Sequence, residues 1–224
     1  ATDGATIYYT TDVTDPATSA TKQTYSTPLA ISSTTKLRAI AVKSGYVNSS
    51  EASATYTFPT EVANLGALRS ATHPGFYKVT GEAVLTFKSS TRNTKYVQDA
   101  TGAVVIDDNS GVITTVYNLK DGITGITGTT AMYNGMLQFT PVTDPGAATS
   151  TNNTVTPVTV AVADMMNNQA KLVRVESVLI TGTGNFAAST SYNLNGSSST
   201  VIRTQYADAD YITTPMAIPA VAQD

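Results

Sequence analysis

Short stretches of alternating side chains, each followed by turn residues, constrain the fold of this chain more than any other feature. In TTKLRAIAVKSGY (34–46), residues 37, 39, 41 and 43 alternate with residues 38, 40 and 42, so the two sets face opposite sides of a strand. Threonine, whose branched Cβ suits a pleated sheet, is the commonest residue, at 40 of 224. Turn residues recur about every 8 to 12 positions. The pattern predicts an all-β protein.

Composition narrows the class further. Charged residues make up 13% of the chain, and the sparse Leu, Glu, Lys and Arg disfavour long amphipathic helices. The net charge of −3 gives no overall positive field to attract nucleic acid. The absence of cysteine excludes disulfides and thiolate metal sites. No apolar run reaches the roughly 18 residues of a membrane-spanning helix.

The first segment, residues 1–58, contains four predicted strands joined by turns. They cover 5–12, 28–31, 34–46 and 50–58, and an Asp-Pro turn lies at 15–16. This spacing of alternating strands is typical of a β-sandwich.

The same segment resembles the fibronectin-III-like module found at the C-terminus of chitobiase and β-hexosaminidase. The resemblance lies in IYYTTD (7–12), the Asp-Pro turn, Tyr25 before Pro28, TTKLRAIAVKSGY, Asn48-Ser49 and ATYTF (54–58). Val13 stands where the family usually has Gly, so the turn there is expected to differ in type. The resemblance implies a truncated Ig/fibronectin-III-like sandwich whose first strands precede Ala1. Its open sheet edge is expected to be covered by another chain or by a relocated strand.

Residues 59–75 are predicted to form a linker with one short helix. The apolar residues at 62, 65 and 68 in VANLGALRSA (62–71) have the spacing of a helix.

Residues 76–156 are predicted to form a second β domain. A long strand covers 77–90, with Gly81 marking a bulge or strong coil. A hairpin covers 94–108 and turns at Asp-Ala-Thr-Gly, where we expect Gly102 to have a positive φ. The segment GVITTVYNLKDG (111–122) follows, and a second hairpin in 123–142 turns at Asn134-Gly135.

This arrangement resembles an OB-fold barrel. The similarity lies in YVQDATGAVVI, LKDGITGITGT and YNGMLQFTPV, with Lys120-Asp121-Gly122 where Gly-Asp is more usual. Such domains occur in secreted and surface-anchored proteins of Bacteroidetes-type bacteria, sometimes beside extracellular nucleases or phosphatases.

Residues 157–224 have two interpretations. A helical turn around Met165 and a strand over 171–181 precede a "Tyr, turn with Gly, strand" unit in 191–212, which repeats the start of the preceding domain. The segment is therefore either a partial second OB-like domain or an accessory sheet that extends the first barrel.

Catalytic motifs are missing from the sequence. The only histidine, His73, lies beside Pro74-Gly75 in a predicted loop, and no G-x-S-x-G elbow is present. Adjacent carboxylates at Asp107-Asp108, and the nearby pair Asp208 and Asp210, do not by themselves give the separation that a glycosidase needs. Asp107, Asp108 and Asn109 are weak calcium candidates, and turn chemistry also explains them. We expect no enzyme activity and no cofactor.

A ligand-binding surface is the better functional hypothesis. OB barrels commonly bind through strands two and three and the loops beside them. Tyrosines next to cations there suit sugar rings or single-stranded bases, although core packing explains some of them equally well. The candidate residues are Arg92, Lys95, Tyr96, Gln98, Tyr117, Lys120 and Tyr133.

Two functions remain open. The first is a non-catalytic structural, adhesive or ligand-presenting module of a larger bacterial surface protein, extracellular or on the cell surface. The second is an accessory carbohydrate- or nucleic-acid-binding module of a secreted hydrolase or nuclease whose catalytic domain lies outside this chain. Polysaccharide, other surface proteins and self-assembly through the open edge are the expected partners, and nucleic acid is disfavoured by charge.

Overall fold

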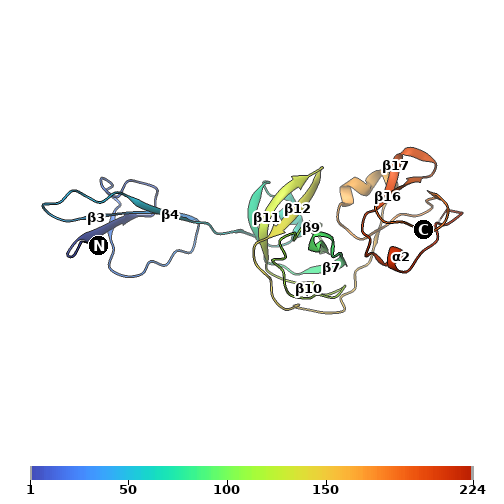
Figure 1. Cartoon of the computed structure of the whole chain (residues 1–224), viewed down its shortest axis with the longest axis horizontal. Coiled ribbons are helices and arrows are strands. Elements are labelled where there is room, and N and C mark those ends of the chain that lie inside the picture. The colour runs from blue at the N-terminus through green and yellow to red at the C-terminus, as the bar shows by residue number, and fades with distance from the viewer. Residues whose placement is uncertain (1, 223–224) are drawn as a thin grey trace. The chain divides into compact units, whose positions relative to one another are not determined.

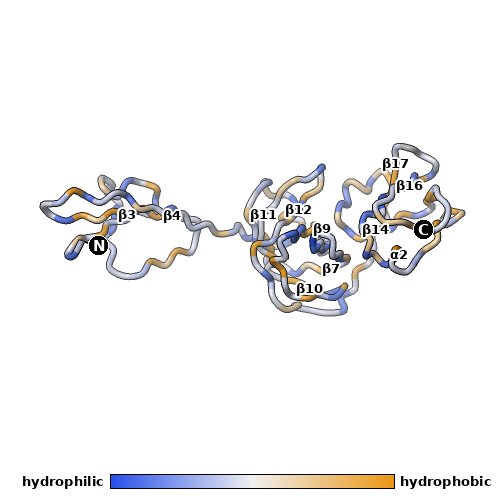
Figure 2. The backbone as a smooth tube through the Cα atoms, in the orientation of Figure 1, coloured by the Kyte–Doolittle hydropathy of each residue, from blue (hydrophilic) through white to orange (hydrophobic). Residues whose placement is uncertain are grey.

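The regular secondary structure of the protein is mainly β-strand, as the sequence predicts. The computed structural model describes residues 2–222, which fall into two compact units that divide between Phe58 and Pro59. Figure 2 shows apolar positions scattered in short patches along the tube of both units, not gathered into one long run. No helix in the described part of the chain has the length and apolar character needed to cross a membrane.

The first unit contains a four-stranded antiparallel sheet in the order β2-β1-β3-β4. Its strands are β1 (Thr6–Thr10), β2 (Gln23–Thr24), β3 (Thr35–Val42) and β4 (Ala52–Tyr56). The strand predicted over 28–31 is wrong, because these residues form a loop that begins at a proline without an N–H. Leu29 and Ile31 of this loop line a hollow with Tyr56 of β4. Their alternation therefore reflects contacts with the sheet and not a place in its hydrogen-bonded ladder.

The turn after β1 contains Val13, at the position where the resembled family usually has glycine. Val13 has a φ of 60°, a left-handed conformation that glycine adopts without strain. The Asp12 carboxylate holds the turn by accepting hydrogen bonds from the backbone N–H of Thr14 and the hydroxyl of Thr21. A glycine-type turn is thus kept by side-chain hydrogen bonds although valine occupies it.

The second unit is organised around an eight-stranded sheet in the order β10-β7-β8-β9-β12-β11-β6-β5 (Figure 1). Its strands are β5 (Thr60–Val62), β6 (Gly75–Val79), β7 (Ala83–Lys88), β8 (Lys95–Gln98), β9 (Ala103–Ile106), β10 (Gly122–Ile123), β11 (Ile126–Tyr133) and β12 (Met136–Pro141). The consecutive strands β6 and β7 lie toward opposite ends of this order, so the sheet curls into a barrel-like form. Two pairs are parallel, β9 with β12 and β5 with β6.

The long strand predicted over 77–90 is interrupted at residues 80–82. A Cβ on Gly81 would lie 2.3 Å from the Ala63 carbonyl oxygen, so only glycine lets the chain pass there. A separate bulge lies farther along, between Leu85 and Phe87 in the pairing of β7 with β8. The predicted irregularity is therefore present, and it divides the strand into β6 and β7.

Both predicted hairpins of this unit are confirmed, with one correction. β8 pairs with β9, and β11 pairs with β12 through Asn134 and Gly135, whose φ values are 48° and 79°. The positive φ predicted for Gly102 is wrong. Its lack of a side chain serves close packing instead, because a Cβ would lie 3.1 Å from the backbone of Leu65 and Gly66.

The predicted short helix is α1 (Leu65–Ser70), and it forms part of the core. Asn64 caps it by accepting a hydrogen bond from the Ala67 N–H. Leu65 and Leu68 are completely buried and pack in the same cluster as Phe139 of the barrel. Thr60–Val62, within the stretch predicted as a linker, pairs with β6, so this stretch contributes both a strand and a helix to the second unit.

The segment between the two hairpins, residues 111–122, is a loop that leads into β10. Residues 111–121 are irregular, and only Gly122–Ile123 pair, as β10. Carboxylates accept the N–H groups that a neighbouring strand would otherwise bind: Asp108 those of Val112 and Ile113, and Asp144 those of Thr114 and Thr115. Side-chain capping has replaced the sheet ladder here.

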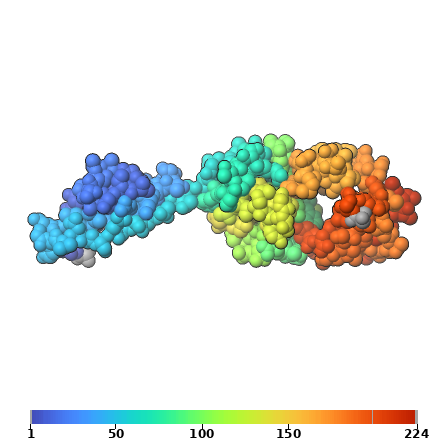
Figure 3. Space-filling model, turned by 90° about the horizontal axis from the view of Figure 1, so that it is seen from above, coloured from blue at the N-terminus to red at the C-terminus, as the bar shows by residue number. Residues whose placement is uncertain are grey.

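Residues 158–222, here called the C-terminal lobe, contain two small sheets. They comprise β13 (Val158–Thr159), β14 (Val173–Arg174), β15 (Ile180–Thr181), β16 (Thr190–Leu194) and β17 (Ser197–Thr204). Besides α1, the short helices described in the second unit are η1 (Thr91–Asn93), η2 (Val162–Asn168) and α2 (Asp210–Thr213). The lobe lies against the barrel in Figure 3, where it is orange and red beside green and yellow.

Within the lobe, the helical turn around Met165 and the hairpin of residues 191–204 are confirmed. The continuous strand predicted over 171–181 is wrong, because only its two ends pair, as β14 and β15. The strands of the lobe form sheets of their own, β13-β14 and β15-β16-β17, separate from the eight-stranded sheet.

Candidate functional site

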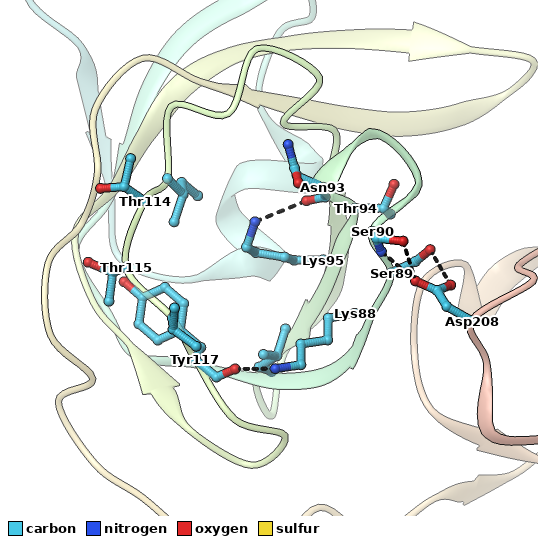
Figure 4. Close-up of a pocket in the computed structure, with 13 residues that line it drawn as sticks. Lys88, Ser89, Ser90, Asn93, Thr94, Lys95, Thr114, Thr115, Tyr117 and Asp208 are labelled. Carbon is cyan, nitrogen blue, oxygen red and sulfur yellow. Dashed lines mark hydrogen bonds between the residues drawn. The ribbon is translucent and has the colours of Figure 1, made fainter. Parts of the chain in front are cut away.

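A cavity of about 440 Å³ opens at one end of the barrel (Figure 4). Strand β8 begins at Lys95 beside this cavity and ends at Gln98, next to Asp99, which accepts a hydrogen bond from the first N–H of α1. The cavity and α1 therefore lie at opposite ends of β8. Leu85 and Ile113, both buried, contribute its apolar surface.

Two lysines from neighbouring strands project into this cavity. Lys88 ends β7, Lys95 begins β8, and the two are directly paired in the antiparallel register. Figure 4 shows both side chains extending into the same opening. The Lys95 ammonium donates to the Asn93 carbonyl at 3.0 Å and lies 3.5 Å from the buried Asp108 carboxylate. The Lys88 ammonium donates to the Tyr117 carbonyl at 2.6 Å.

The opposite wall is the irregular segment 112–118, which is held in place by three aspartates. Asp108 and Asp144 accept hydrogen bonds from its N–H groups as described above, and Asp121 accepts one from Asn118 at 2.7 Å. The Gly146 N–H also donates to Asp144, and this bond and those from Thr114 and Thr115 lower the pKa of Asp144 far below its ordinary value. These hydrogen bonds hold the backbone of this wall in one conformation, so its carbonyl and methyl groups have fixed positions in the cavity.

The C-terminal lobe contributes one residue to the rim. Asp208 accepts hydrogen bonds from the Ser89 hydroxyl at 2.6 Å, and from the Ser90 N–H at 2.6 Å and hydroxyl at 2.7 Å. The Ser89 hydroxyl is the main reason that the pKa of Asp208 falls from 3.8 to about 2. Figure 4 shows its carboxylate turned toward this serine pair.

The C-terminal lobe packs on the predicted candidates Tyr96 and Gln98, and of the two only Tyr96 borders a pocket. The Gln98 side chain accepts a hydrogen bond from the Leu172 N–H at 2.7 Å, and the hydroxyls of Tyr96 and Tyr206 lie 3.1 Å apart. Burial raises the pKa of Tyr96. Tyr96, Phe87 and Tyr211 are among the residues that line a smaller pocket, of about 250 Å³, at this contact.

The other predicted residues are distributed over several environments. Arg92 makes a two-pronged ion pair with Asp107, Tyr117 is 2% exposed and donates to the Gly146 carbonyl, and Lys120 and Tyr133 are exposed. Of the predicted set, the cavity brings together Lys95 and Tyr117. It adds Lys88, Thr114, Thr115 and Asp208 as lining residues that the prediction omitted. The hairpin register could have revealed Lys88, since it and Lys95 flank the turn at equal distance from its centre.

The calcium candidates already have protein partners. Asp107 binds Arg92, and Asp108 accepts two backbone N–H groups and lies beside Lys95. Among residues 2–222, no group of three or more acidic or histidine side chains is arranged to hold a metal ion.

The environment of His73 contains a hydroxyl and a ring. Its Nδ1 lies 2.8 Å from the Thr130 hydroxyl, its ring packs edge-on against Tyr77, and its Nε2 is buried without a hydrogen-bond partner in the described chain. No carboxylate bonds to either ring nitrogen among these contacts, so the geometry of a Ser-His-Asp triad is not present around it.

Comparison with known proteins finds one family. Residues 1–56 match the family model described as "Fn3 associated". This match covers about a quarter of the chain and supports a fibronectin-III-associated module in the first unit. No curated protein and no solved structure matches the chain.

Proposed function

We propose that this chain is a non-catalytic, ligand-presenting β-module of a larger extracellular or surface protein of a bacterium, and that its ligand occupies the barrel-end cavity. The observation that carries the proposal is the contrast between two surfaces of the barrel. Around Tyr96 and Gln98 the chain's own lobe packs on the strand surface and leaves a pocket of about 250 Å³, whereas the cavity beside Lys88 and Lys95 is larger, about 440 Å³, and holds two ammonium groups. A concave site with an apolar floor and a few fixed polar groups is suited to a small ligand.

The first unit suits the role of an accessory module. Its match to a fibronectin-III-associated family and its IYYTTD motif support a relationship to the chitobiase C-terminal type of module. We assign no catalytic step to the chain, because its one histidine has the surroundings described above.

The barrel is, in our proposal, of the OB type. The order β7-β8-β9-β12-β11-β6 supports this assignment if β6 and β7 are taken as two halves of one first strand. The parallel pairing of β9 with β12, with Gln138 opposite Val105, has the Greek-key character of that barrel. Nuclear Overhauser contacts between these two strands would test the assignment, and an antiparallel register would refute it.

The test of the ligand site is a titration followed by amide chemical shifts. Oligosaccharides released from bacterial and plant polysaccharides are added to the full chain, and we expect shifts in residues 88–95 and 113–117. Val116, on the rim and 84% exposed, is changed to Trp to obstruct the opening. Val142→Trp, at an exposed position outside the cavity lining, is the control. Binding that survives Val116→Trp would place the ligand elsewhere and reject the proposal.

The alternative is an accessory module of a secreted hydrolase or nuclease. It shares the same cavity and differs in the neighbouring catalytic domain, so activity of the intact parent protein on an immobilised polysaccharide, with and without Val116→Trp, distinguishes the two. A loss of hydrolysis caused by this variant favours the enzyme-accessory function.

Self-assembly is a second candidate function for the first unit. Every residue of β4 is exposed, and β4 is the last strand in its sheet order. A second copy could add its own β4 to this edge. Sedimentation velocity over a range of concentrations tests this, with Thr55→Lys on the edge as the variant expected to keep the chain monomeric.

A further inference from the structure

The facing lysines of the cavity carry an energetic cost. Like charges directly opposite each other in an antiparallel pair destabilise a sheet, and Lys88 and Lys95 are directly opposite. Their two ammonium groups also share the same opening. A neutral residue at position 88 would remove the repulsion and leave the ion pair of Lys95 with Asp108 in place, so the charge of Lys88 indicates a use other than folding.

The charges of the protein balance only one of the two lysines. Lys95 has Asp108 as its counter-charge, and its side chain is 11% exposed. Lys88 donates to a neutral carbonyl, and within residues 2–222 no carboxylate lies within ion-pair distance of it. Asp208 also lines the opening, but both of its oxygens accept hydrogen bonds from the Ser89-Ser90 pair. An ammonium has three donors, so Lys88 can still bind an anionic oxygen.

The shape and lining of the cavity favour a sugar acid over a nucleic acid. A volume of about 440 Å³ accommodates a small ligand, and Val116 on the rim, which is 84% exposed, offers an aliphatic surface for the C–H face of a sugar ring. Single-stranded nucleic acid needs exposed aromatic rings for base stacking. Tyr117 is the only aromatic residue that lines this cavity in the described chain, and it is 2% exposed.

We propose that the barrel-end cavity binds an acidic sugar unit of a polysaccharide and holds its carboxylate beside the Lys88 and Lys95 ammonium groups. This inference rests on the proposed function, because it names the ligand class of the same cavity.

The experiment compares trigalacturonic acid with its uncharged methyl ester by isothermal titration calorimetry on the full chain. We expect the acid to bind at least about tenfold more tightly than the ester, because the ester cannot make the charged hydrogen bonds. Lys88→Gln should weaken binding of the acid by about tenfold or more and leave the ester unchanged. Lys36→Gln, an exposed lysine of the first unit, is the matched control and should change neither.

A second readout separates a binding role from a structural one. Without ligand, Lys88→Gln should change the unfolding temperature little, because the relief of repulsion across β7 and β8 offsets the lost hydrogen bond to the Tyr117 carbonyl. Binding of the acid should also weaken as salt rises from about 50 to about 300 mM. Unchanged stability together with weaker binding supports the proposal, and weaker binding that accompanies a large loss of stability would show that Lys88 acts only on the structure.

The opposing outcomes are distinct. Equal binding of acid and ester, both abolished by Val116→Trp, would overturn the acidic-sugar inference and leave the cavity as the ligand site. Tighter binding of a short thymidine oligonucleotide, lost in Lys88→Gln, would replace sugar acid with nucleic-acid phosphate. Binding of inorganic phosphate as tightly as the sugar acid would show that the sugar ring contributes nothing, and would also reject the inference. If none of these probes binds the wild-type chain, the acidic-sugar inference fails, and the wider oligosaccharide titration decides the proposed function by itself.

Discussion

The Asp144 carboxylate accepts hydrogen bonds from both the backbone N–H and the hydroxyl of Thr114, at 2.9 and 2.8 Å. The same oxygen accepts the corresponding two groups of Thr115. One side chain, 29 to 30 residues away in the sequence, thus replaces the neighbouring strand that this segment lacks. The wall of the cavity depends on this contact more than on any regular secondary structure.

Removal of this carboxylate should destabilise the second unit. Asp144→Ala leaves the N–H groups of Thr114 and Thr115 without their acceptor, and we expect the free energy of unfolding to fall by about 1–3 kcal/mol. Urea denaturation of the full chain measures this change. Asp164→Ala, at an exposed position in η2, is the control and should change stability by less than about 0.5 kcal/mol. An equally small effect of Asp144→Ala would mean that the wall does not need this aspartate.

Acid should weaken the contact between Asp208 and the serine pair. The pKa of Asp208 is lowered to about 2, chiefly by the Ser89 hydroxyl, so its contribution to stability is present above the unfolded value near 3.8. That contribution is lost as the pH falls from about 4 through about 2. The chemical shift of the Ser90 amide, followed by acid titration, should report this midpoint.

Substitution of Ser89 tests whether its hydroxyl sets the pH midpoint of the Asp208 titration. Ser89→Ala removes the largest contribution, so the midpoint should move upward toward 3.8. Asp208→Asn should abolish the titration of the Ser90 amide in this window. A midpoint that stays the same in Ser89→Ala would show that the hydroxyl does not set the pKa.

The elements that depend on local patterns could be predicted from the sequence. Asn134-Gly135 adopts the two positive φ values that a tight hairpin needs, and the spacing of residues 62, 65 and 68 indicated the helix that became α1. Both signals lie within a few residues of the structure that they predict. The alternation of β3 was equally local, and it predicted one of the longest strands of the chain.

The parts of the site that depend on distant partners could not be predicted in this way. Residues 111–121 are rich in residue types that favour strands. Their N–H groups are nevertheless bound by the carboxylates of Asp108, Asp144 and Asp121. The pairing of Asp144 with Thr114 leaves no trace in the local sequence. Tyr96 is an aromatic residue of the kind that often binds ligands, yet its hydroxyl contacts that of Tyr206, 110 residues later in the sequence. Only the tertiary structure reveals that the lobe covers this surface.

Gly81 should tolerate no side chain. A Cβ at this position would lie 2.3 Å from the Ala63 carbonyl oxygen, so Gly81→Ala must displace the backbone before α1. We expect a loss of about 1–3 kcal/mol in the free energy of unfolding. Thr129→Ala, on an exposed position of β11, serves as the control in the same urea experiment and should change stability by less than about 0.5 kcal/mol. Retention of full stability in Gly81→Ala would show that α1 can move without cost.

Val13→Gly should stabilise the first unit. Valine at a φ of 60° brings its Cβ close to the following carbonyl, a strain of about 1–2 kcal/mol that glycine lacks. Glycine also makes the unfolded chain more flexible, which offsets part of this gain and leaves about 0.5–1 kcal/mol. Hydrogen exchange of the amides in β1 and β3 measures the effect on this unit alone. Val47→Gly is the matched control: Val47 is 96% exposed and lies outside the positive-φ positions, so the same substitution should slightly accelerate exchange. Faster exchange in Val13→Gly would mean that the hydrogen bonds of Asp12 already compensate for the strained turn.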